Sequence, residues 1–147
     1  TLPHTLWHMD TGFDRILPTP MGTVFVCLDR HDPGGGATLA LAGSHRLVDR
    51  YTLRLDETQR AGSSAAWSRM LREDPWTRDL ITPSAEPDRT TRLMGDGSVV
   101  DGVRVGVVEM VGDAGDAFVT DIHTYHCASP NASDRPRMMR GCVFQRS

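Results

Sequence analysis

Two short segments, far apart in the sequence, carry side chains that bind metal ions in proteins. One is His8-Met9-Asp10, and the other holds two histidines, His123 and His126. Side chains alternate along an extended segment, so His8 and Asp10 point to the same side. Either distal histidine would complete a set of two histidines and one carboxylate. Such a set, on one face of an octahedron with other positions open, is typical of non-heme Fe(II) sites.

Two arginines follow the distal histidines and suggest what else this site binds. Arg135 and Arg137 are two residues apart, so both lie on one side of the chain if the segment is extended. A guanidinium offers a planar fork of donors that matches a carboxylate with two hydrogen bonds. A metal set together with such an arginine predicts a keto-acid ligand with a second, distant carboxylate.

Strands are the elements that must position these residues. Short apolar runs separated by turns rich in Gly, Pro and Asp predict strands at 23–28, 37–42, 103–111 and 117–122. His31 falls in one of these turns, where we expect it to be solvated. The pattern of strand, turn and strand indicates an all-β barrel or sandwich.

Residues 47–92 interrupt this pattern and are the least regular and most polar part of the chain. Within them, residues 64–72 have helical propensity, with apolar side chains on one face, and we expect this to be the one short helix of the chain. Asp74-Pro75 is expected to end that helix. We interpret 47–92 as an insertion within the domain or a lid over the barrel mouth, where substrate contacts would lie.

The order and spacing of these motifs resemble the phytanoyl-CoA dioxygenase (PhyH) family of Fe(II)- and 2-oxoglutarate-dependent oxygenases. The family has a His-x-Asp, a Gly-rich strand ending in Gly-Ser-His, and a distal His followed by Ser, Asn, Ser and Arg. The corresponding segments are His8-Met9-Asp10, residues 34–45 and residues 126–137. The resemblance implies a mostly β fold, the double-stranded β-helix or jelly-roll related to cupins, as one catalytic domain over 1–147.

The resemblance also chooses between the alternatives in the site. It implies that His8, Asp10 and His126 hold the catalytic metal and that Arg137 pairs with the far carboxylate of 2-oxoglutarate. His123 then becomes a structural neighbour, and Arg135 becomes a solvated charge. Further hydrogen bonds to the cosubstrate are expected from Ser129 and Ser133, and Thr38 is expected to face the same pocket.

The implied reaction uses Fe(II), 2-oxoglutarate and O2 to hydroxylate a small organic substrate, with release of succinate and CO2. Halogenating relatives lack the carboxylate ligand, so Asp10 favours hydroxylation. Alternatives are a truncated, non-catalytic jelly-roll or cupin-like domain that binds metal, and a cupin-like enzyme using another metal without 2-oxoglutarate. A zinc hydrolase is disfavoured, because the sequence has neither His-Glu-x-x-His nor paired-Cys spacing.

Composition narrows the partners. The 147 residues include 16 basic and 19 acidic side chains, a net charge of -3 without any basic run, which argues against nucleic acid. No apolar stretch has the length to cross a bilayer. Three cysteines without Cys-x-x-Cys spacing favour a reducing, cytoplasmic setting. The expected partner is a small-molecule substrate.

The first motif comes early for this family. Members usually carry helices and strands before the His-x-Asp, which this sequence reaches at residue 8. We therefore expect an N-terminally truncated catalytic domain. A missing strand would leave a sheet edge open, which favours self-association or pairing with the missing N-terminal segment.

Overall fold

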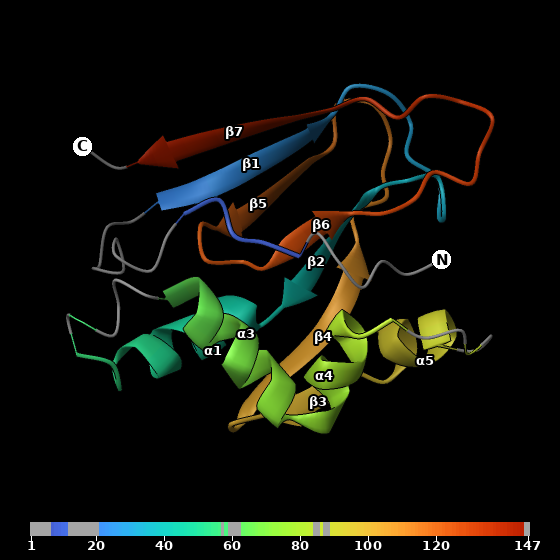
Figure 1. Ribbon diagram of the computed structural model, residues 1–147. Helices are drawn as coiled ribbons and strands as arrows, with labels where there is room; N and C mark the ends of the chain where they lie inside the picture. Colours follow the sequence, from blue (N-terminus) through green and yellow to red (C-terminus); the bar gives the residue numbers. More distant parts are fainter. Residues whose placement is uncertain are drawn as a thin grey trace.

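The computed structural model describes residues 7–11, 21–56, 58, 63–83, 86 and 89–145. Two antiparallel sheets dominate the fold, with helices beside one of them (Figure 1). The strands are β1 (Met21–Cys27), β2 (Thr38–Ala42), β3 (Ser98–Val100), β4 (Val103–Glu109), β5 (Ala117–Asp121), β6 (His126–Ala128) and β7 (Met139–Gln145). The helices are α1 (Ser44–Thr52), α3 (Ser63–Glu73), α4 (Pro75–Ile81) and α5 (Arg89–Gly95). The expectation of a mostly β chain is confirmed, and the arrangement is consistent with a jelly-roll.

The three-stranded sheet has the order β5-β1-β7. Its central strand, β1, is the β-branched run predicted from the sequence, and it pairs with β5 on one side and β7 on the other. Thr23, Phe25 and Cys27 alternate along β1 and are buried. These side chains face the second sheet, because Phe25 shares a small core with Ala40 of β2 and Met110 after β4.

The four-stranded sheet has the order β3-β4-β2-β6. Alternation along β2 gives its two faces different roles. Thr38 and Ala40 lie on the inner face toward the first sheet, whereas Leu39 and Leu41 lie on the outer face in the main core. Val103, Val105 and Val107 of β4 bury their side chains in that same outer core.

Helices cover this outer face, and the expectation of one short helix is wrong. The predicted helix is α3, but α1, α4 and α5 accompany it. Each of these described helices packs apolar side chains on the outer face of the sheet, namely Leu47, Trp67, Leu71, Leu80 and Leu93. Asp74-Pro75 separates two helices, since the Asp74 carboxylate accepts hydrogen bonds from the backbone N–H groups of Trp76 and Thr77 and so caps α4.

The described helices within 47–92 therefore form a layer on the outer face of the four-stranded sheet. In Figure 1 they lie at the bottom and the three-stranded sheet lies at the top, with β2 and β4 between. The interpretation of 47–92 as an insertion or a lid stays a prediction. Within the described residues, no helix combines the length and apolar character needed to span a membrane.

The turn from β2 into α1 explains the Gly-Ser-His segment. Gly43 has a φ of 84°, and a Cβ atom there would lie 2.2 Å from the carbonyl oxygen of Arg104. Only glycine fits this conformation and this close approach. The next residue, Ser44, is fully buried, and its Oγ accepts a hydrogen bond from the backbone N–H of Tyr125 at 2.8 Å. This contact ties the start of α1 to the segment that leads into β6.

Candidate metal centre

The two predicted ligand segments lie side by side. His8 and His126 form an isolated antiparallel bridge, with N–H···O distances of 2.9 Å from His8 to His126 and 2.8 Å in return. His126 is the first residue of β6, whose other neighbour is β2. The bridge places the His8-Met9-Asp10 segment at the edge of the four-stranded sheet, as the sequence pattern requires.

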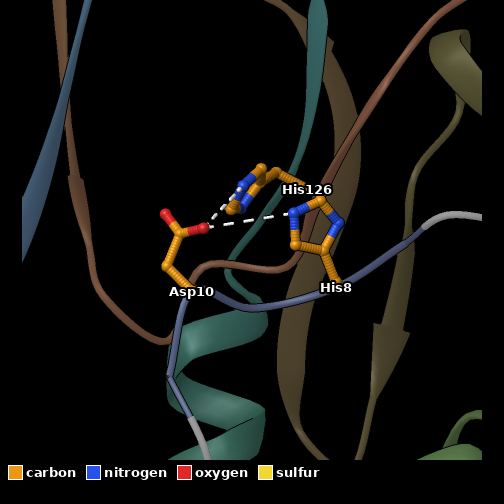
Figure 2. Close-up of side chains that lie close together, drawn as sticks. All are labelled: His8, Asp10 and His126. Atoms are coloured by element: carbon orange, nitrogen blue, oxygen red, sulfur yellow. Dashed lines mark ion pairs between the residues drawn. The ribbon is translucent and has the colours of Figure 1, made fainter. Parts of the chain in front are cut away.

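The bridge brings three potential ligand atoms together (Figure 2). Asp10 Oδ1 lies 4.0 Å from His8 Nε2 and 3.6 Å from His126 Nε2. One ligand atom from each of the three residues lies within 4.8 Å of the other two. Metal bonds of about 2.1 Å hold neighbouring ligand atoms roughly 3 Å apart, so small side-chain rotations would close the cluster around an ion.

Neighbouring groups orient two of the three side chains. Thr23 of β1 donates a hydrogen bond to Asp10 Oδ2 at 3.1 Å, which leaves Oδ1 directed at the histidines. His126 Nδ1 lies 2.9 Å from the carbonyl oxygen of Thr124. A carbonyl only accepts, so Nδ1 carries the hydrogen and Nε2 presents a lone pair toward Asp10. This orientation is the one that metal-binding histidines use, and the donor set fits Fe(II).

The cluster has a buried side and an open side. The side chain of His126 is 8% exposed, that of Asp10 27% and that of His8 56%. Phe25 meets the His126 ring edge-on, with ring centroids 5.3 Å apart. A cavity of about 400 Å³ lies between the sheets, and its lining includes Ala40 and Thr124, which contact His126, as well as Met110, Phe118, His45 and Asp121. A small, largely apolar molecule fits such a space.

Arg137 and Arg135 have different environments. The half-buried guanidinium of Arg137 points to the inner face of β2, where Nη1 donates to Thr38 Oγ1 at 3.2 Å and lies 3.9 Å from Met139 Sδ. Among the described residues, no carboxylate lies within ion-pair distance of Arg137. Arg135 is exposed and pairs with Asp32 at 2.9 Å. The arginine chosen by the resemblance is therefore the one with unused charge, and Thr38 faces the same region, as expected.

The two serines expected near the cosubstrate hydrogen-bond to the protein itself. Ser129 donates to the carbonyl oxygen of Ala37 at 2.8 Å. The exposed Ser133 hydroxyl lies 2.7 Å from Asn131 Oδ1 and 3.1 Å from the Arg135 carbonyl oxygen. No hydrogen bond found among the described residues joins either serine to Arg137. Their predicted contact with 2-oxoglutarate stays a prediction.

Two further histidines, His123 and His31, lie outside the cluster, and both are buried. His123 is buried away from the cluster, with Nδ1 3.4 Å from Asp121 and 3.8 Å from Asp49. His31 is buried as well, so the expectation that it is solvated is wrong. Its ring contacts the segment next to Arg137, a role that nothing in the local sequence indicates.

The fold and the cluster together define a jelly-roll-like domain with a His-Asp-His centre, and comparison with known proteins places it in a family. The profile of the family described as Phytanoyl-CoA dioxygenase (PhyH) matches residues 3–139. The chain belongs to this family, whose membership suggests Fe(II)- and 2-oxoglutarate-dependent oxygenase activity. No curated protein matches the chain.

One solved structure supports the fold. The chain is similar to EvdMO1, with a TM-score of 0.50 and 20% identity over 98% of this chain and 24% of that one. AviO1 from Streptomyces viridochromogenes Tue57 matches with a TM-score of 0.39 and 20% identity, over 96% of this chain and 43% of that one. The chain thus spans less than half the length of either protein.

Proposed function

We propose that this chain is the catalytic portion of an Fe(II)- and 2-oxoglutarate-dependent dioxygenase that hydroxylates a small organic substrate. The observation that carries the proposal is the convergence of His8, Asp10 and His126, together with Arg137, which donates to Thr38 of β2 and has no carboxylate within ion-pair distance among the described residues. In the overall reaction one oxygen atom of O2 enters a C–H bond of the substrate and the other enters succinate, as 2-oxoglutarate loses CO2.

The residues of the chain have separate tasks in this proposal. Asp10 and the two histidines would hold Fe(II), which supplies the activation of O2 when bound. Arg137 would hold the far carboxylate of 2-oxoglutarate with two charge-assisted hydrogen bonds, and Thr38 fixes the position of the guanidinium. The cavity lined by Ala40 and Phe118 would exclude water and receive the substrate.

The first test is anaerobic addition of Fe(II) and then 2-oxoglutarate, followed by the visible charge-transfer band of the chelate. The parent should show the band, and His126→Ala and Arg137→Ala should lose it. Arg135→Ala is the matched control, since it removes the same side chain two residues away, and it should keep the band. A folded parent without any band would contradict the proposal.

Turnover then separates the oxygenase from a non-catalytic metal-binding domain. Purified chain with Fe(II), 2-oxoglutarate and O2 should release succinate, with slow uncoupled release even before the substrate is known. A chain that binds both ligands and releases no succinate under O2 would support the non-catalytic domain.

A further inference from the structure

The loop between β1 and β2 contains a buried histidine that the proposed reaction does not use. The His31 side chain has no exposed surface. Its Nε2 lies 3.1 Å from the carbonyl oxygen of Met138 and 3.2 Å from Asp29 Oδ1. Its Nδ1 lies 3.5 Å from Cys27 Sγ. Because the carbonyl only accepts, Nε2 carries the hydrogen and Nδ1 accepts from the thiol.

The protonated state of Cys27 agrees with this arrangement. Burial, and then the nearby Asp116 and Asp29, raise the pKa of the Cys27 thiol, while Arg137 opposes the shift. The thiol therefore stays a hydrogen-bond donor at neutral pH. The backbone of His31 is fixed as well, because it exchanges two hydrogen bonds with Gly112 at 2.8 and 3.2 Å. The ring is thus held on both sides.

Three groups of this loop converge on the backbone of Met138. The Met138 N–H donates to Asp29 Oδ1 at 3.1 Å. The Met138 carbonyl oxygen accepts from the Leu28 N–H at 2.9 Å and from His31 Nε2. Both backbone polar groups of Met138 are therefore satisfied, and the backbone position immediately after Arg137 is fixed.

This fixed backbone determines where the Arg137 guanidinium lies. The loop before it is exposed, and Arg135 extends to Asp32 on the surface. One residue before the clamped Met138, Arg137 points inward to Thr38. An arginine holds a carboxylate in two hydrogen bonds only if its fork has the correct position and direction.

We propose that His31 is a positioning residue for Arg137, which holds the guanidinium in place for the far carboxylate of a dicarboxylate cosubstrate by hydrogen-bonding the Met138 carbonyl. The proposal rests on the proposed function for the identity of the cosubstrate. It predicts that His31 contributes to the affinity for 2-oxoglutarate and not to the affinity for the metal.

The test compares His31→Leu, His31→Gln and Arg135→Ala with the parent. Calorimetric titration first gives the Kd of Fe(II) without oxygen, and then the Kd of 2-oxoglutarate for the Fe(II)-loaded chain. His31→Leu should raise the 2-oxoglutarate Kd about tenfold, the lower end of the effect of removing an outer hydrogen-bonding partner. The Fe(II) Kd should not change. His31→Gln, whose amide can still donate to Met138, should recover part of the affinity, and Arg135→Ala should behave as the parent.

A second measurement needs no ligand. The Arg137 side-chain N–H signal in an NMR spectrum, assigned by its loss in Arg137→Ala, should shift in His31→Leu and much less in His31→Gln. A His31→Leu chain with lower thermal stability but an unchanged Arg137 signal and unchanged 2-oxoglutarate Kd would show a purely structural role and overturn the inference. A parent that binds Fe(II) but no 2-oxoglutarate would overturn the proposed function, and this inference with it.

Discussion

The two ends of the candidate site are built differently. The metal end (His8, Asp10 and His126) joins a short segment to the sheet through one isolated bridge, and the His8 side chain is 56% exposed. At the arginine end (Arg137 and Met138), three groups of the loop 28–31 hold the Met138 backbone. The arginine end is therefore fixed by contacts within the protein, whereas under the proposed function the metal end would gain its final geometry from the ion.

This difference suggests a division of work. Arg137 has no carboxylate partner among the residues that the structure describes, and such a guanidinium must be held firmly, since a mobile arginine would pair with a surface carboxylate, as Arg135 does with Asp32. Metal ligands can be less rigidly held before the ion binds, because the ion supplies a large binding energy and draws them together. Three predictions test this contrast, beginning with the largest effect, and two further predictions concern Cys127.

Removing the carboxylate ligand should abolish the metal end alone. Asp10→Ala is expected to weaken Fe(II) binding by more than about 100-fold, because loss of even an outer hydrogen-bonding partner commonly costs 10–100-fold. The Arg137 side-chain NMR signal should stay in place. Asp49→Ala, which removes an exposed carboxylate beside His123, is the control and should bind Fe(II) as the parent does. Equal loss of affinity in both variants would place the ion elsewhere.

Adding the ion should order one end more than the other. Fe(II) at 100 times its Kd should raise the free energy of unfolding by about 2.7 kcal/mol, or the Tm by about 5–10 °C. Hydrogen exchange at the His8 and His126 amides, which form the bridge, should slow further on metal addition. The Met138 amide should exchange slowly with or without metal. Its exchange should slow no further than the gain in global stability requires. If metal addition protects the Met138 amide from exchange as much as the His8 amide, the proposed difference between the two ends is contradicted.

The hydrogen bond from Thr23 to Asp10 should have a moderate effect. Thr23→Val keeps the shape of the side chain and removes the donor to Asp10 Oδ2. The Fe(II) Kd should rise roughly tenfold, and Thr23→Ser should restore most of the affinity. Thr120→Val is the matched control, because Thr120 pairs with Thr23 in the sheet but donates to a backbone carbonyl. If Thr23→Val keeps the parent affinity, the orientation of Asp10 does not depend on this bond.

The sequence predicted the parts of the fold that follow from local pattern. The short apolar runs predict β1, β2, β4 and β5, since alternation and apolar character are local properties. Helices α4 and α5 have seven residues each and were missed, because so few turns give little periodic signal and their stability comes from packing on the sheet. The strand β7 was not predicted either, since its residues are mostly exposed.

The sequence does not predict those parts of the site whose placement depends on contacts between residues far apart in the chain. Counting along a strand could not choose between His123 and His126, and the structure shows why: the chain leaves β5 at Asp121 and enters β6 of the other sheet at His126. Motif order favours His126, which is the histidine that lies with His8 and Asp10 in the structure. The sequence indicates a solvated His31, because the burial of this side chain depends on contacts with Gly112 and Met138, which are remote in sequence.

The smallest effect is expected from the cysteine next to the distal histidine. Cys127 follows His126 on β6, so its sulfur faces the outer core with Leu39 while the imidazole faces inward. Cys127→Ala should therefore leave the Fe(II) Kd unchanged, whereas a clear loss of affinity would show that the thiol reaches the ion. Arg137 and the hydrogen bonds of the loop 28–31 to the Met138 backbone should be unaffected.

Alkaline unfolding reports the same burial independently. Burial raises the pKa of the Cys127 thiol from 9.0 to about 12. Between these values the thiol ionises in the unfolded chain and stays protonated in the folded one, so the unfolded state binds fewer protons and stability falls as pH rises. Urea unfolding from pH 8 to 11 should show a shallower decline for Cys127→Ala than for the parent, with the remaining decline partly due to Cys27. An equal slope in both chains would mean that Cys127 ionises in the folded state and that this part of β6 is open to water.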